Sequence, residues 1–160
     1  MSPRPTMTPE IARQASQEIV ARLLKRRLID RDSADAIAHI ARSYRAHMDG
    51  YELARALEER YHWICDFAIA EVLNDLSGVA RDLLLKAQKT WADTERPKPP
   101  YSINDRIKLR NSGKTGIITE IRGPSQFLVA IDGDPQAFGP SERRSIVNFE
   151  DALPVEAVSA

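Results

Sequence analysis

The stretch NDRIKLRNSGKTGIITEI, residues 104–121, differs in pattern from everything that precedes it in the chain. Ile107 and Leu109 alternate with charged residues, which is typical of a strand with one solvated face. The segment NSGKTG follows and is rich in residues that tolerate turns, and β-branched residues come after it. The stretch therefore predicts two strands joined by a turn, the second over residues 117–121.

The same rhythm continues toward the C-terminus. Phe127, Val129 and Ile131 alternate as a third strand, Ile146 and Val147 mark a fourth, and residues 153–155 a fifth. Five short strands in so few residues predict a small antiparallel barrel over residues 102–155. We expect residues 156–160 to form a disordered tail.

The chain before this region has the periodicity of helices, and we expect a helical domain of about four helices over residues 8–94, after a disordered tail of residues 1–7. Thr8 and Pro9 are typical of a helix start, and this first helix should end near Leu28. Asp32 or Ser33 would cap the second helix. Its expected apolar face comprises Ala34, Ile37, Ala38, Ala41 and Tyr44.

Two further boundaries complete the helical prediction. The pair Asp49-Gly50 is expected to end the second helix, because glycine often follows a helix C-terminus. A third helix should run from Tyr51 to about Leu76, since neither proline nor glycine interrupts it. The residues around Ser77 and Gly78 would then break the chain before a fourth helix that reaches Trp91.

Residues 95–101 separate the two patterns. Pro97, Pro99 and Pro100 cannot continue a helix and favour an extended, stiff spacer. The fold class predicted from the whole chain is therefore α+β with segregated parts: a helical bundle, a proline-rich linker and a small β-barrel.

The segment 104–121 resembles the KOW-type segment of SH3-like barrels. The matching positions are Asp105, Ile107, Leu109, Gly113, Gly116, Ile118 and Ile121. The spacing of three between the last two isoleucines breaks strict alternation, which a β-bulge would allow. The ending VNFEDALPV is similar to the helical turn and last strand that close such barrels. The resemblance covers residues 102–155 and implies an SH3-like barrel; the helical first part followed by this barrel is also similar in outline to nitrile hydratase β-type subunits.

The composition excludes several classes of function. Lys and Arg together number 23 in the 160 residues, and so do Asp and Glu, so no net charge attracts nucleic acid over long range. Cys65 is the single cysteine, which excludes an intramolecular disulfide, and we expect it to be buried and inert. No apolar run is long enough for a membrane helix and no secretory signal opens the chain. We expect a cytoplasmic protein without a membrane partner.

One candidate binding site is the basic strand face formed by Arg106, Lys108, Arg110 and Lys114, which would contact nucleic-acid phosphates. Residues 101–160 nevertheless hold seven basic against eight acidic residues, so nucleic acid is disfavoured and a solvated strand face is the main alternative.

Motifs for catalysis, metals and cofactors are weak. Glu59 and His62 have the ExxH spacing of di-iron bundles, but the chain offers no second such pair. The Gly-Lys-Thr in SGKTG lacks the first glycine of a phosphate-binding loop, because Leu109 stands there, and strand-forming residues follow it. We therefore expect no enzyme activity, no metal site and no cofactor.

The segment YHWICDF, residues 61–67, carries Tyr61, Trp63 and Phe67. A single helical stripe cannot bury all three, so we expect one face to pack internally and another to meet a second subunit, as in a homodimer. The alternative is a helix buried on most sides. The leading hypothesis is a non-catalytic interaction or regulatory protein that self-associates through its helices and docks an unidentified protein partner on its barrel. The alternatives are a nucleic-acid-binding regulator and a subunit-like component of a metalloenzyme.

Overall fold

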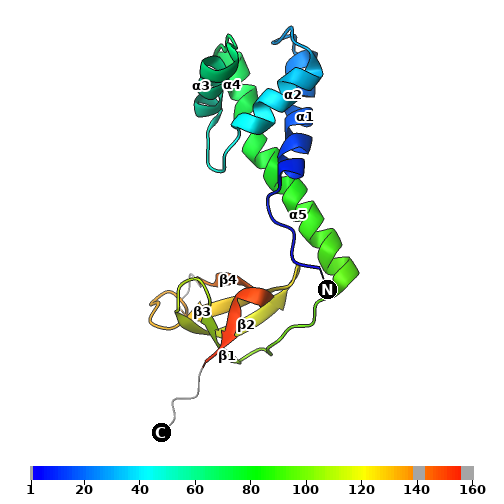
Figure 1. Ribbon diagram of the computed structural model, residues 1–160. Coiled ribbons are helices and arrows are strands. Elements are labelled where there is room, and N and C mark those ends of the chain that lie inside the picture. The colour runs from blue at the N-terminus through cyan, green and yellow to red at the C-terminus, as the bar shows by residue number, and fades with distance from the viewer. Residues whose placement is uncertain (1, 139–142, 156–160) are drawn as a thin grey trace. The chain divides into compact units, whose positions relative to one another are not determined.

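The structure is a computed structural model that describes residues 2–138 and 143–155 (Figure 1). Five helices precede a five-stranded antiparallel sheet in this part of the chain, which confirms the predicted α+β class. The helices are α1 (Pro9–Lys25), α2 (Ser33–Ser43), α3 (Gly50–Tyr61), α4 (Phe67–Asn74) and α5 (Leu76–Glu95). The strands are β1 (Arg106–Leu109), β2 (Thr115–Arg122), β3 (Gln126–Ile131), β4 (Ser145–Asn148) and β5 (Ala152–Pro154), with a 3-10 helix, η1 (Phe149–Asp151), before β5.

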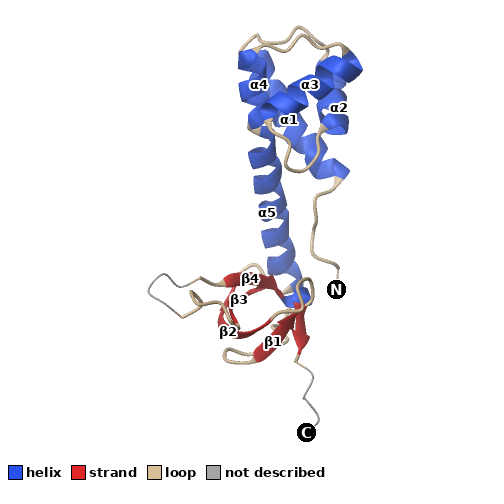
Figure 2. Ribbon diagram, turned by 90° about the vertical axis from the view of Figure 1, so that its left-hand side faces the viewer, coloured by secondary structure: helices blue, strands red, loops and turns tan. Residues whose placement is uncertain are grey.

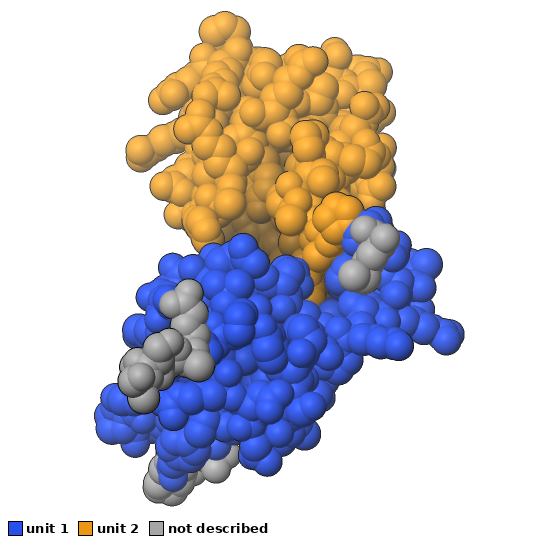
Figure 3. Space-filling view, turned by 60° about the horizontal axis from the view of Figure 1, so that its bottom comes forward, with its two compact units in different colours: residues 1–2, 89–160 blue, residues 3–88 orange. Residues whose placement is uncertain are grey.

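The chain divides into two compact units (Figure 3). The helical unit comprises residues 3–88, and the sheet unit comprises residues 89–160 with the first two residues. The division falls inside α5 and not at the proline-rich segment, because α5 continues unbroken to Glu95. Residues 2–7, expected to be a disordered tail, lack regular secondary structure, yet two of their carbonyls accept hydrogen bonds from the Gln88 amide and the Trp91 indole of α5. The tail expected at residues 156–160 lies outside the described residues.

The first helix forms as its sequence predicts. The hydroxyl of Thr8 accepts a hydrogen bond from the Ile11 amide at 3.3 Å, and Pro9 occupies the first turn. One face of α1 is buried in the core of the helical unit, through Ala12, Ala15, Ser16, Ile19, Val20 and Leu23. The helix ends at Lys25, three residues before the predicted end.

The prediction that Asp49-Gly50 ends the second helix is wrong. α2 ends at Ser43, and Asp49 instead caps α3 in a reciprocal capping box with Glu52. Gly50 is required here for close packing, because a Cβ at this position would lie 2.1 Å from the carbonyl oxygen of Ala70. The Gly50 amide also donates to the Asn74 side chain at 3.0 Å, which joins the start of α3 to the end of α4.

The prediction of one long third helix is also wrong. α3 stops at Tyr61 because His62 adopts a left-handed conformation with φ of 54°, and α4 begins only at Phe67. A single residue, Asp75, separates α4 from α5, and Gly78, expected in a break, lies within α5. The predicted long helix is therefore two helices joined by the loop of residues 62–66.

The sheet unit confirms the predicted strands (Figure 2). Hydrogen-bonded neighbours follow the order β4-β3-β2-β1-β5, so β4 and β5 are the outer strands. The register of β2 against β3 shifts between Ile118 and Glu120, which confirms the bulge expected from the isoleucine spacing. Gly116 lies so close to β3 that a Cβ would be 2.5 Å from the Ala130 carbonyl oxygen.

One face of this sheet forms a separate apolar core. Its buried members are Ile107, Ile118, Phe127, Val129, Ile131, Val147, Phe149 and Ala152. The short helix η1 and strand β5 follow β4, as the resemblance of VNFEDALPV to the end of an SH3-like barrel implies. The pairings establish a five-stranded antiparallel sheet, and closure into a barrel remains a prediction.

Candidate protein-interaction site

The loop of residues 62–66 directs one aromatic side chain into the helical core. Trp63 is buried, with 4% of its surface exposed, and its indole Nε1–H donates to Nδ1 of His39 in α2 at 3.2 Å. The His39 ring stacks on Tyr61 at the end of α3, with centroids 3.8 Å apart and an angle of 13° between the planes. These contacts hold the loop against α2 and α3.

Polar contacts fix both ends of the same loop. The Arg31 guanidinium lies over the Trp63 ring, 5.1 Å from its centroid, and donates to the His62 carbonyl at 3.0 Å. The Cys65 amide donates to the Glu58 carboxylate at 3.2 Å, and Asp66 caps α4 by accepting from the Ile69 amide at 2.9 Å. The loop is therefore held in one conformation by contacts to the helical unit.

Three large apolar side chains are exposed in or beside this loop. Ile64 is 91% exposed and Phe67 is 64% exposed. Tyr51, at the start of α3, is 52% exposed, and its ring lies 6.2 Å from that of Phe67 at an angle of 54°. We call Tyr51, Ile64 and Phe67 the apolar patch. Exposed aromatic and large aliphatic groups close together on a fixed backbone are typical of protein-interaction surfaces.

Sequence reasoning placed only part of this site. Tyr61, Trp63 and Phe67 are close in sequence, but the structure places their side chains in different environments. Phe67 is exposed, Tyr61 is partly buried against His39, and Trp63 is buried in the core. Trp63 thus has no surface to offer a second subunit. Tyr51 and Ile64 were missed, because a continuous helix over the segment hid the outward turn of the loop.

Cys65 lies beside the apolar patch in the chain but is a poor nucleophile. The pKa of its thiol is raised to about 11, chiefly by burial and then by the nearby carboxylates of Glu58 and Asp66, against the smaller opposite effect of Arg31. The thiol is therefore protonated at neutral pH. The cysteine is partly buried rather than fully buried as expected.

The predicted basic strand face is partly engaged within the sheet unit. Arg106 forms an ion pair with Asp132, 2.5 Å between Nη2 and Oδ2, and the Thr115 hydroxyl donates to the same carboxylate. The hydrogen bond from Thr115 and then the Arg106 contacts lower the pKa of Asp132. Arg110 donates through Nε to the Glu150 carbonyl at 3.3 Å. Lys108 and Lys114 are exposed.

No family model, curated protein or solved structure matches this chain. Its function must therefore be argued from its own residues and their geometry.

The described residues contain neither a candidate metal site nor a candidate membrane-spanning helix. Within residues 2–138 and 143–155, no three His, Cys, Asp or Glu side chains gather closely enough to hold a metal ion. The predicted ExxH pair is divided by the end of α3, because His62 is the left-handed residue that terminates the helix. Across the same residues, no helix has both the length and the apolar character needed to cross a membrane.

Proposed function

We propose that this chain is a non-catalytic interaction protein. Its helical unit self-associates through the apolar patch, and its sheet unit docks a protein partner. The observation that carries the proposal is the exposed Tyr51–Phe67 ring pair with Ile64, which is 91% exposed, on a loop fixed by its inward contacts.

The fixed loop favours binding for an energetic reason. Ordering a flexible segment on association costs free energy, and this cost subtracts from the gain of burying apolar surface. Here Trp63 and Asp66 already hold the backbone on either side of Ile64, so Ile64 and Phe67 project from an ordered support. Aromatic residues in ordered surroundings are the usual energetic centres of protein interfaces.

The sheet unit offers a second, smaller apolar surface. Ile146 on the outer strand β4 pairs with Leu128 on β3, on the face opposite the buried Phe127–Val147 pair. Ile146 is 59% exposed. An outer strand with an exposed apolar residue suits a partner that adds an extended segment to the sheet edge. Nucleic-acid binding receives less support, because Arg106 and Arg110 are already engaged by groups of the sheet unit.

Sedimentation equilibrium of the full chain tests self-association. We expect a mass that increases with concentration, and Phe67→Asp should weaken the association about 30-fold or more, as loss of an interface centre does. Leu85→Asp is the matched control, because Leu85 in α5 is also an exposed apolar residue of the helical unit. A monomer at all concentrations, or equal weakening by the control, would contradict the proposal.

Docking on the sheet unit has its own test. Affinity capture with the full chain should recover a protein that Ile146→Asp loses and that Ile103→Asp retains, since Ile103 is exposed outside the strands. Recovery of the same proteins by both variants would remove β4 from the proposal.

A further inference from the structure

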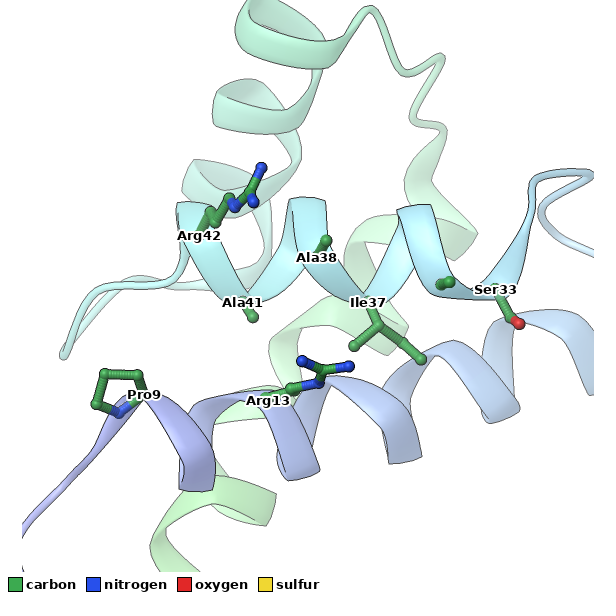
Figure 4. Close-up of a pocket in the computed structure, with 8 residues that line it drawn as sticks. Pro9, Arg13, Ser33, Ile37, Ala38, Ala41 and Arg42 are labelled. Atoms are coloured by element: carbon green, nitrogen blue, oxygen red, sulfur yellow. The ribbon is translucent and has the colours of Figure 1, made fainter.

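A groove between α1 and α2 is not used by the proposed self-association surface (Figure 4). It encloses about 480 Å³, and its floor on α2 is formed by Ala34, Ile37, Ala38 and Ala41. Arg13 contributes from α1 and Arg42 from the last turn of α2. Figure 4 shows Arg13 extending from α1 toward Ile37 and Ala41.

The groove exists because α2 has two apolar faces. Its buried face comprises Ala36, Ile40 and Ser43 and packs in the helical core. The other apolar residues repeat at the first, fourth, fifth and eighth positions from Ala34, which is the pattern of a helix that meets a partner. These four residues belong to the apolar face expected from the sequence, and they remain exposed or only partly buried. Three of the four are alanines, which permit close approach of another chain.

The charges around the groove indicate the chemistry of that chain. Arg13 and Arg42 are both exposed, and within the described residues neither makes an ion pair or a hydrogen bond through its side chain. Arg22 on α1 differs, because Glu18 and Asp75 both bind it. Guanidinium groups bind carboxylates with two parallel hydrogen bonds, so two uncommitted arginines beside an apolar floor are complementary to an acidic, amphipathic segment.

We propose that the α1–α2 groove binds an acidic amphipathic segment of a partner protein. Apolar side chains of this segment pack on Ile37 and the alanines, and its carboxylates bind Arg13 and Arg42. α2 has 11 residues, a length of about 16 Å, so a helical segment of about three turns matches it. This inference does not depend on self-association, since it uses none of the residues of the apolar patch.

Selection from a displayed library of random peptides of about 12 residues, against the full chain, tests the proposal. We expect enriched peptides to combine Asp or Glu with apolar residues at helical spacing. The double variant Arg13→Glu, Arg42→Glu should weaken their binding about 10-fold or more, and Arg13→Ala, Arg42→Ala by less. The control Arg45→Glu, Arg55→Glu reverses two exposed charges of the same unit that do not line the groove.

Each outcome of this selection decides the question. No enriched peptide, no acidic bias, or equal binding to the groove and control variants would overturn the proposal. Phe67→Asp should leave peptide binding unchanged while it reduces self-association, so the two proposals fail separately. If the enriched peptides instead dissociate the oligomer of the wild-type chain, a second copy occupies the groove, and the proposal of a distinct partner is overturned.

Discussion

Replacing Trp63 by alanine tests the inward half of the loop geometry. The side chain is 4% exposed, so the variant removes almost all of a buried indole and leaves a cavity. Truncation of a buried tryptophan destabilises by about 3–5 kcal/mol. Trp63→Phe keeps most of the buried ring but removes the Nε1 hydrogen bond to His39, so we expect a smaller cost of about 1–2 kcal/mol.

Phe67→Ala provides the matched comparison from the outward side of the same region. Phe67 is 64% exposed, so roughly a third of its surface is buried in the chain. At about 25 cal/mol per Å² of apolar surface, its truncation should cost about 1–2 kcal/mol. The inward placement of Trp63 and the outward placement of Phe67 therefore predict that Trp63→Ala lowers the free energy of unfolding more than Phe67→Ala does.

Urea unfolding measures the free energy of unfolding of each variant. Circular dichroism at helical wavelengths follows the helical unit, because all five α-helices of the described residues precede the strands. Dilute protein keeps self-association from contributing. Equal destabilisation by Trp63→Ala and Phe67→Ala, or a larger effect of Phe67→Ala, would refute the placement of the two rings and with it the apolar patch.

Three further predictions concern other parts of the chain. Gly50→Ala should destabilise the helical unit by about 2 kcal/mol or more, measured by the same unfolding assay, because its Cβ would collide with the Ala70 carbonyl. Cys65 should react with a thiol reagent at mildly alkaline pH about 100-fold more slowly than a free cysteine, since its raised pKa leaves little thiolate, and reaction at the normal rate would contradict this. Asp132 has a lowered pKa, so it stabilises the sheet unit above about pH 4 and this contribution is lost as the pH falls through the lowered value. Asp132→Asn should therefore be less stable than the wild type at neutral pH in thermal unfolding and converge with it in acid; a constant difference would contradict the lowered pKa that Thr115 and Arg106 give to Asp132.

The parts of the fold that follow local chemistry were predictable from the sequence. Thr8 and Asp32 cap α1 and α2 as their side chains and positions indicate. The alternation around Ile107 gave the strands, and the spacing between Ile118 and Ile121 gave the bulge. These features depend on a few neighbouring residues, so they can be recognised without the tertiary structure.

The break in the third helix was not predictable in the same way. Residues 62–66 contain neither proline nor glycine, and a non-glycine residue, His62, takes the left-handed conformation that ends α3. The burial of Trp63 between His39 and Arg31 provides the tertiary contacts there. Asp66 was the one local signal of the new helix α4, since an aspartate just before an apolar run is typical of a helix start.

The candidate site shows the same limit. Helical periodicity identified an apolar face on α2, but it could not show that a second face, through Ala36 and Ile40, is the one buried in the helical core. Tyr51 is adjacent to Gly50, whose close contact with α4 depends on the packing of two helices. The apolar patch is therefore a product of tertiary structure, although each of its residues is apolar in the sequence.

Nuclear magnetic resonance of the full chain over a dilution series tests the central claim most directly. If the helical unit self-associates through the apolar patch, the signals of Tyr51, Ile64 and Phe67 should shift together with concentration, while those of the buried Trp63 indole stay nearly constant. Spectra that do not change from micromolar to millimolar concentration, or changes confined to residues outside the patch, would contradict the account.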